Sequence, residues 1–326
     1  MSARRRLYTA AELLGGFESD DPHSYTDTLD GRVYLQAVRD GLRLPNHEHV
    51  GRERALHDHA VSEALRFRLR DQRVVAIMGG HALRRDEPTY RMVASIARAL
   101  TRAGLLVLSG GGPGAMEATH LGARVALVPD PVLDDAISAL GQARHAAFPS
   151  EATHLVHRRA ADGDPAWDYE VVAALHAWQR PAFAIAAETD PGAAASIGIP
   201  TWLYGHEPPT PFATHHAKYF ENSIREDGLL AVATNGVMYA PGGPGTFQEV
   251  FQDLAQNYYR TAGLFSPMVF LDVGQFWTVS HPVKALIDAI LPDADERNTH
   301  YVQTGADVVR VLREFRVPSG RGTRPW

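Results

Sequence analysis

The sequence contains no cysteine and almost no lysine. Without a thiol among its 326 residues, the chain cannot form disulfides, thiolate zinc sites or iron–sulfur clusters, and it has no cysteine nucleophile. Only Lys218 and Lys284 are lysines among the 32 basic residues, so arginine carries nearly all the positive charge. No stretch approaches the roughly 20 consecutive apolar residues that a membrane-spanning helix needs.

An excess of positive charge is also missing. The formal net charge is −6, with 38 acidic residues, so we expect no general attraction to nucleic acid or to anionic membranes. The N-terminus, MSARRRLYTAAELLGGF, begins with basic residues as a secretion signal does. Glu12 interrupts its short apolar part, which predicts a cytoplasmic protein.

The pattern of apolar residues predicts an α/β fold with a helical N-terminal extension. Residues 1–70 contain no strong strand signal, whereas Arg52–Leu69 has helical spacing. Residues 71–317 alternate strand-like and helix-like segments, which predicts a Rossmann-like, doubly wound, mainly parallel sheet with helices on both faces. An insertion is expected at about 130–180 and a flexible tail at 318–326.

Seven strands and several helices are expected in this domain. The strand candidates are Val74–Met78, Leu105–Leu108, Arg124–Val128, Ala182–Ala187, Ile199–Tyr204, Gly236–Ala240 and Met268–Leu271. The helix candidates are Tyr90–Arg102, Ala115–Ala123, Glu170–Trp178 and a helix that follows Pro241–Gly245.

Two glycine-rich loops each follow a predicted strand and lead into a predicted helix. The first loop contains Gly110, Gly111, Gly112 and Gly114, and the second contains Gly242, Gly243 and Gly245, followed by Thr246. Residues without side chains let backbone amides approach a phosphate, and the first helical turn adds unpaired N–H groups and a positive dipole end. One such loop is equally compatible with a turn that binds nothing. Two at the carboxyl edge of one sheet predict a phosphate-bearing ligand in a shared crevice.

Other nucleotide motifs fit less well. Gly110, Gly112 and Ala115 match the spacing of the dinucleotide fingerprint, but they follow the second predicted strand rather than the first. Asp130, the acid at the matching distance, is followed by Pro131. No Walker lysine follows either loop, which disfavours nucleoside triphosphate hydrolysis.

The loops SGGGPGAMEA and PGGPGTFQE together resemble the paired signature of the Lonely Guy (LOG) family of nucleoside-monophosphate phosphoribohydrolases, formerly labelled lysine decarboxylase-like. The resemblance covers roughly Arg73 to Phe315 and is closer to the long bacterial branch of nucleotide 5′-monophosphate nucleosidases. It implies a homodimer, or a higher homo-oligomer, that hydrolyses the N-glycosidic bond of a nucleoside 5′-monophosphate without a metal or other cofactor.

The resemblance also assigns two catalytic residues, Glu249 and Arg225. A carboxylate at Glu249 stabilises the positive charge that develops when the glycosidic bond breaks, and a guanidinium at Arg225 holds the sugar-phosphate bidentately. Each position has a structural alternative. Thr246 and Glu249 have the spacing of a helix capping box, and Arg225 can pair with its neighbours Glu221 or Glu226.

Other polar residues near the loops carry weaker signals. Glu117 is expected either to bind a ribose hydroxyl or to favour its own helix dipole, and Met116 to pack or to line the wall beside the base. His206, His215 and His216 lie in a proline-rich segment whose spacing fits no zinc helix, so no metal is expected. Lys218 is expected to be exposed, with phosphate contact as the alternative.

Three further functions are open on this sequence. The same fold could carry a nucleotide or a pterin-type cofactor without turnover, as molybdenum-cofactor carriers with similar loops do; retention of Arg225 and Glu249 favours the enzyme. Single-stranded DNA binding is disfavoured by the net charge and by the lack of a basic–aromatic stripe. Amino-acid decarboxylation is disfavoured because neither lysine has a recognisable pyridoxal-phosphate context.

Overall fold

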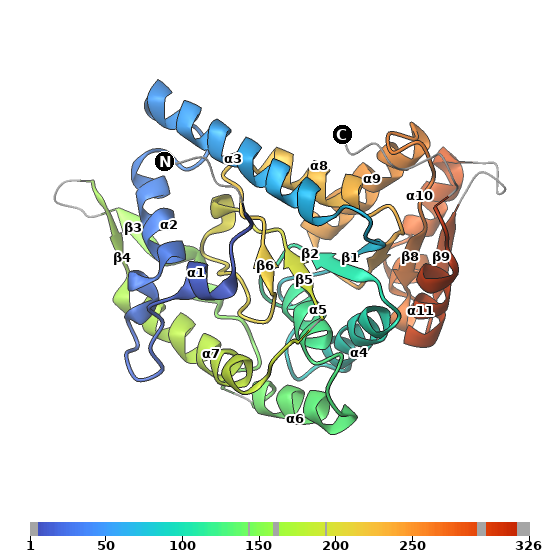
Figure 1. Ribbon diagram of the computed structural model, residues 1–326, viewed down its shortest axis with the longest axis horizontal. Coiled ribbons are helices and arrows are strands. Elements are labelled where there is room, and N and C mark those ends of the chain that lie inside the picture. Colours follow the sequence, from blue (N-terminus) through green and yellow to red (C-terminus); the bar gives the residue numbers. More distant parts are fainter. Residues whose placement is uncertain (1–5, 143, 159–162, 193, 292–297, 318–326) are drawn as a thin grey trace.

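A seven-stranded parallel sheet forms the centre of the molecule (Figure 1). The computed structural model describes residues 6–142, 144–158, 163–192, 194–291 and 298–317. The strand order is β6-β5-β2-β1-β7-β8-β9, and every neighbouring pair is parallel. The strands are β1 (Val74–Met78), β2 (Leu106–Ser109), β5 (Ser196–Gly198), β6 (His215–His216), β7 (Val237–Tyr239), β8 (Met268–Leu271) and β9 (Thr299–Val302).

Helices cover both faces of the sheet, which confirms the predicted fold class. All five residues of β1 are buried, because successive side chains point into opposite apolar layers. One layer contains α4 (Pro88–Arg102), α5 (Ala115–Arg124), α6 (Asp130–Leu140) and α11 (Gly305–Glu314). The other contains α3 (Glu48–Arg68), α8 (Asn222–Val232), α9 (Pro244–Tyr258) and α10 (Val283–Ile290). In Figure 1, α3, α8 and α9 lie together, on the side of the sheet away from α4 and α5.

Two predicted strands are not strands in the structure. Arg124–Val128 is the end of α5 and the turn after it, and Ala182–Ala187 lies inside α7 (Tyr169–Glu188). A short apolar run fits a buried strand and a buried helix equally well. In α7 the alanines favour a helix, and the Asp168 carboxylate caps its first turn by accepting from two backbone N–H groups.

The remaining predicted elements agree more closely. The predicted strand Ile199–Tyr204 is displaced, because the sheet uses Ser196–Gly198 and Trp202–Tyr204 forms a 3₁₀ turn, η3. The strands β6 and β9 were not predicted: β6 has only two residues, and every residue of β9 is half-buried. The predicted helix Arg52–Leu69 corresponds to α3.

The N-terminal region packs directly on the sheet. It contains α1 (Ala10–Leu14), a 3₁₀ turn η1 (Ser24–Asp27), α2 (Leu29–Arg39) and α3. Leu13, Tyr25 and Val61 are buried in the same apolar layer as one face of the sheet. The backbone of Tyr8 exchanges two hydrogen bonds with His216 at the outer edge of β6, so this segment covers a strand edge that would otherwise be unpaired.

Residues 130–188 add helices and a short hairpin beside the sheet. After α6, the 3₁₀ turn η2 (Ser150–His154) leads to β3 (Val156–Arg158), which pairs antiparallel with β4 (Pro165–Trp167) and is followed by α7. After β8 the chain passes through the short turns η4 (Val273–Gln275) and η5 (Phe276–Ser280) to α10. None of the helices in the described part combines the length and the apolar character needed to cross a bilayer. The predicted tail, 318–326, lies outside the described residues.

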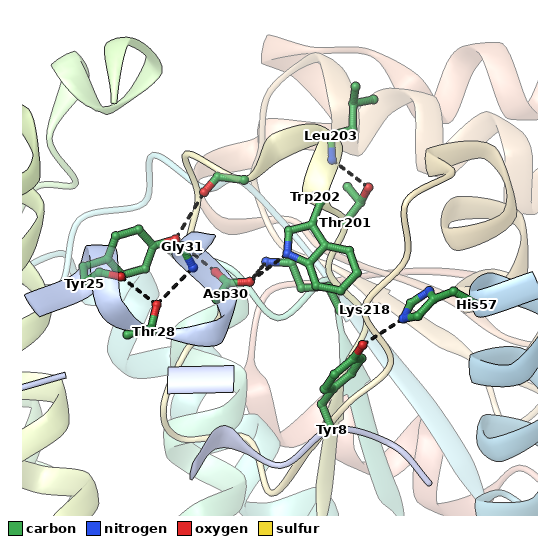
Figure 2. A network of polar contacts seen from close by, with 11 residues as sticks. Tyr8, Tyr25, Thr28, Asp30, Gly31, His57, Thr201, Trp202, Leu203 and Lys218 are labelled. Carbon is green, nitrogen blue, oxygen red and sulfur yellow. Dashed lines mark hydrogen bonds and ion pairs between the residues drawn. The ribbon is translucent and has the colours of Figure 1, made fainter. Parts of the chain in front are cut away.

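A buried ion pair joins the N-terminal region to the sheet layer (Figure 2). The Lys218 ammonium is fully buried and lies 2.5 Å from Oδ1 of Asp30, which lies in the first turn of α2. Asp30 also accepts hydrogen bonds from the Trp202 indole and the Tyr25 hydroxyl. Burial lowers the pKa of Lys218, and the charge of Asp30 opposes this effect. Lys218 is therefore neither exposed nor available to a phosphate, contrary to both predictions from the sequence.

The two lysines of this chain allow a matched test of this ion pair. Asp30→Asn leaves the Lys218 ammonium buried without a counter-charge, and we expect it to cost about 3 kcal/mol or more of unfolding free energy. Lys218→Met leaves the opposite charge unpaired and should cost a similar amount, and the double variant should recover part of both losses. The control is Lys284→Met, because Lys284 is half-exposed and pairs with Asp288 one turn away.

We expect the Lys284 variant to lose less than about 0.5 kcal/mol. Urea unfolding measures all four variants. Equal losses at Lys218 and Lys284 would contradict this account of the network.

Candidate functional site

The two glycine loops lie on either side of β1, at the carboxyl edge of the sheet. The first loop follows β2 and the second follows β7, and these two strands flank β1. The short loop after β1 contacts both. Gly80 accepts a hydrogen bond from the Ala115 N–H at 3.1 Å and donates one to the Pro241 carbonyl at 3.4 Å. The strand order also reverses here, because the chain builds β2, β5 and β6 on one side of β1 and β7, β8 and β9 on the other. Open α/β sheets bind ligands at such a switch point.

The first loop is closely packed, and two of its glycines are required by the backbone. Gly111 has φ +77°, and a Cβ there would lie 2.9 Å from the Gly198 Cα atom. Gly114 has φ +67°, and its Cβ would lie 2.4 Å from the Gly80 carbonyl oxygen. Side chains other than hydrogen rarely tolerate this conformation. Packing therefore accounts for these two glycines.

The second loop is open at the start of α9. Gly243 is the N-cap residue and Pro244 the first helical residue, a favoured position for proline. Gly243 and Gly245 are exposed, and a Cβ on either would meet no atom within 4 Å. Gly242 lies closer to β1, because its Cβ would be 2.9 Å from the Gly80 nitrogen. Of the two helix N-termini that follow the glycine loops, that of α9 is therefore the one accessible from outside.

Arg225 on α8 reaches the first glycine loop. Its side chain is buried, and its Nε donates a hydrogen bond of 2.8 Å to the Ile199 carbonyl at the end of β5. A Cβ at Gly110 would lie 2.4 Å from Nη2 of Arg225 and 2.6 Å from the Met116 sulfur. Glycine at position 110 therefore leaves the space that this guanidinium occupies.

Glu249 meets Arg225 from the other loop. Its Oε1 lies 3.9 Å from Nη1 of Arg225, and its side chain is 14% exposed. Burial raises the pKa of Glu249 to about 7; the charge of Arg225 opposes this effect and that of Glu226 adds to it. A carboxyl group with such a pKa changes protonation state near neutral pH, as a catalytic acid or base requires.

The alternative of a capping box at Thr246 is wrong. A capping box needs Thr246 at the N-cap position, whereas the helix begins earlier and Gly243 occupies that position. The Thr246 N–H donates to the Gly243 carbonyl, so it does not need Glu249. Of the two alternative partners of Arg225, only Glu226 lies near its guanidinium. Nη1 lies 3.7 Å from Glu226, while Glu221 caps α8 by accepting from the Ser223 N–H.

Glu117 has a different environment from the one predicted. Its carboxylate is buried and receives two hydrogen bonds from Arg85 and one from the Tyr90 hydroxyl. The Arg85 guanidinium also stacks 3.8 Å from the Trp178 ring and donates to the Trp178 carbonyl. Glu117 therefore anchors the start of α5 to α7 rather than presenting a free carboxylate to a ribose.

Sequence reasoning missed Glu207 as a member of this site. It follows η3 in the segment that contains Gly205 and His206, and its side chain is 18% exposed. Its Oε2 lies 3.6 Å from the position of a Cβ at Gly112, and the Met116 methyl group lies 3.1 Å from the same point. Burial raises the pKa of Glu207, and the charges of His81 and Arg225 oppose this effect. The only signal in the sequence is an acid beside His206 in the proline-rich segment.

The histidines do not form a metal centre in the described part of the chain, where no group of three possible ligands is close enough to hold an ion. His215 and His216 form β6, and His206 lies beside Glu207, 4.0 Å from its carboxylate. A further histidine, His120, is buried below the first loop between the Ser109 and Ser196 hydroxyls. Burial lowers the pKa of His120 to about 3, so it is a neutral part of the support of the loop.

No protein-family model matches this chain, and neither does any curated protein. Among solved structures, the molybdenum cofactor binding protein from the phototrophic bacterium Rippkaea orientalis is 12% identical, over 75% of this chain and 97% of its own, with a TM-score of 0.42. The molybdenum cofactor carrier protein MCP from Chlamydomonas reinhardtii is 12% identical, over 74% of this chain and 96% of its own, also with a TM-score of 0.42. What this site can bind therefore has to be argued from its own residues.

The raised pKa of Glu249 predicts a pH-dependent cost to stability. The pKa is about 7 in the folded protein, against an ordinary value of 4.5, so the folded protein holds a proton that the unfolded chain has released. The contribution of this group to stability is fully present below pH 4.5 and is lost as the pH rises to 7. Glu249→Gln removes this dependence. We expect the Tm of the wild type to fall relative to that of the variant between pH 4.5 and 7.

Thermal melting of both proteins across this range measures the effect. Asp253, whose burial also raises its pKa to about 7, titrates in both proteins, so the difference between them isolates Glu249. A difference in Tm between the two proteins that does not change with pH would show that Glu249 has an ordinary pKa.

Proposed function

We propose that this protein hydrolyses the N-glycosidic bond of a nucleoside 5′-monophosphate to give the free base and ribose 5-phosphate. The observation that carries the proposal is the meeting of Arg225 and Glu249, with 3.9 Å between Nη1 and Oε1, at the edge where both glycine loops end. It is supported by the resemblance of the two loops to the LOG family signature. The homodimer implied by that resemblance stays a prediction.

In this proposal the phosphate binds at the open N-terminus of α9. The exposed glycines Gly243 and Gly245 let an anion approach the backbone N–H groups and the positive end of the helix dipole. Arg225 then lies next to the sugar and holds it with a planar, permanently charged group. The guanidinium is pre-organised, because the Ile199 carbonyl already accepts a hydrogen bond from its Nε.

Glu249 supplies the negative charge that the reaction needs. Positive charge develops on the anomeric carbon, C1′, as the bond to the base lengthens, and a nearby carboxylate stabilises it. The ionised Glu249 also accepts a proton from the attacking water. Its pKa of about 7 allows it to take up this proton and to release it again near neutral pH.

Replacement of Glu249 by glutamine should abolish most turnover. The variant keeps the shape of the side chain but carries no charge, so we expect kcat to fall about 100-fold or more. The measurement is the release of base and ribose 5-phosphate from a panel of nucleoside monophosphates. The control is Glu188→Gln, an exposed acid at the end of α7, which should turn over normally. Near-normal activity of Glu249→Gln would contradict the assigned role.

Replacement of Arg225 by lysine should also impair the reaction. Lysine keeps the positive charge but loses the planar fork that contacts the Ile199 carbonyl and faces Glu249, so kcat/KM should fall roughly 100-fold while the fold is retained. Circular dichroism checks the fold and the same assay measures the activity.

If wild-type protein binds nucleoside monophosphates but releases no base from any of them, the protein is a carrier rather than an enzyme.

A further inference from the structure

A second carboxyl group, that of Glu207, lies at this site and the roles assigned so far do not use it. Its Oε2 and the Met116 methyl group both lie above Gly112, 3.6 Å and 3.1 Å from the position where a Cβ would stand. A side chain at position 112 would crowd the Met116 methyl group, so glycine suits the close packing of Met116 and Glu207 on this loop. A thioether beside an acid suits a flat, nitrogen-rich ring, because sulfur makes favourable contacts with aromatic rings and a carboxyl group can hydrogen-bond a ring nitrogen.

The segment that carries Glu207 is held in place from two directions. Toward the sheet, the Thr210 N–H donates a hydrogen bond of 2.8 Å to the Gly111 carbonyl in the first loop. Toward the N-terminal region, Gly205 packs on the Tyr34 ring so closely that a Cβ would lie 2.1 Å from it. Asp30 on α2 also binds the Trp202 indole, which lies in the turn before Gly205 (Figure 2). Contacts on both sides therefore fix the segment that carries the Glu207 carboxyl group.

Glu207 and Glu249 have different charged neighbours. His81 from the loop after β1 lies 3.7 Å from its carboxylate, and His206 lies 4.0 Å away. The charge of Arg225 acts on both Glu207 and Glu249. Glu249 belongs to the helix that begins at the open phosphate loop, whereas Glu207 lies over the first loop beside Met116. For Glu207 to act on a nucleotide whose phosphate binds at α9, the base has to extend past Arg225 toward Met116.

We propose that Glu207 is a further catalytic residue, the acid that protonates the departing base. This inference rests on the proposed function. In the step, the bond between C1′ and the base nitrogen breaks and its electron pair stays with the base. The carboxyl proton of Glu207 passes to the base, while water forms the new bond to C1′ and gives its proton to Glu249. The raised pKa of Glu207, caused by burial, keeps it protonated at higher pH than an ordinary glutamate.

The test compares two substrates that share the ribose 5-phosphate part and differ in whether the leaving group needs an acid. Nucleoside 5′-monophosphates release a base that must be protonated, whereas 4-nitrophenyl ribofuranoside 5-phosphate releases a stable nitrophenolate. For Glu207→Gln we expect at least about a 100-fold loss of kcat on the natural substrate and a change of less than about threefold on the nitrophenyl substrate. The high-pH limb of the rate profile on the natural substrate should also disappear.

Three variants are compared: Glu207→Gln, Glu249→Gln and Glu188→Gln. Glu249→Gln should lose activity on both substrates, because Glu249 acts on C1′ rather than on the base. Glu188→Gln should keep its activity on both. If Glu207→Gln loses both substrates equally or keeps both, the acid role is overturned while the proposed function stands. If the wild type hydrolyses neither substrate, the proposed function fails and this inference fails with it. Circular dichroism and melting of each variant show whether a loss of activity reflects a loss of fold.

Discussion

The guanidinium of Arg225, held against a glycine, is the contact on which the candidate site depends. Its Nε is bound by the Ile199 carbonyl at the end of β5, and its Nη2 occupies the space that any side chain at position 110 would fill. From there Nη1 reaches toward Glu249. One side chain thus connects the first loop, the end of a strand and the helix after the second loop. A parallel sheet makes this possible, because its strands end at one edge and present their loops to the same space.

The N-terminal region holds in place the segments that carry Arg225 and Glu207. Asp58 on α3 accepts hydrogen bonds from the Phe220 and Glu221 N–H groups, where the chain turns into the helix that carries Arg225. Asp30 on α2 binds Lys218 and Trp202, which lie on either side of the segment that carries Glu207. Buried carboxylates that are fully paired orient the groups around them, although they add little net stability. Residues 6–68 therefore support both the guanidinium and the second acid.

The two glycine loops look alike in sequence but have different surroundings. The first is covered by neighbouring chain, and Gly111 and Gly114 allow backbone to pack on backbone. The second is open at Gly243 and Gly245. The accessible helix N-terminus is therefore that of α9. Arg225, Met116 and Glu207 pack on the first loop. Glu117, in the first turn of α5, is hydrogen-bonded by Arg85 and Tyr90.

The sequence by itself determined the α/β class, the position of β1 and β7, and the two loops, because buried runs and glycine turns are local signals. It did not separate strand from helix at Ala182–Ala187, where a short apolar run fits both. Only the tertiary structure decided that Thr246 lies inside α9, that Lys218 is buried against Asp30, and that Glu207 faces the first loop. These facts depend on contacts between residues far apart in the chain, such as the 188-residue separation of Asp30 and Lys218, and no local pattern records such contacts.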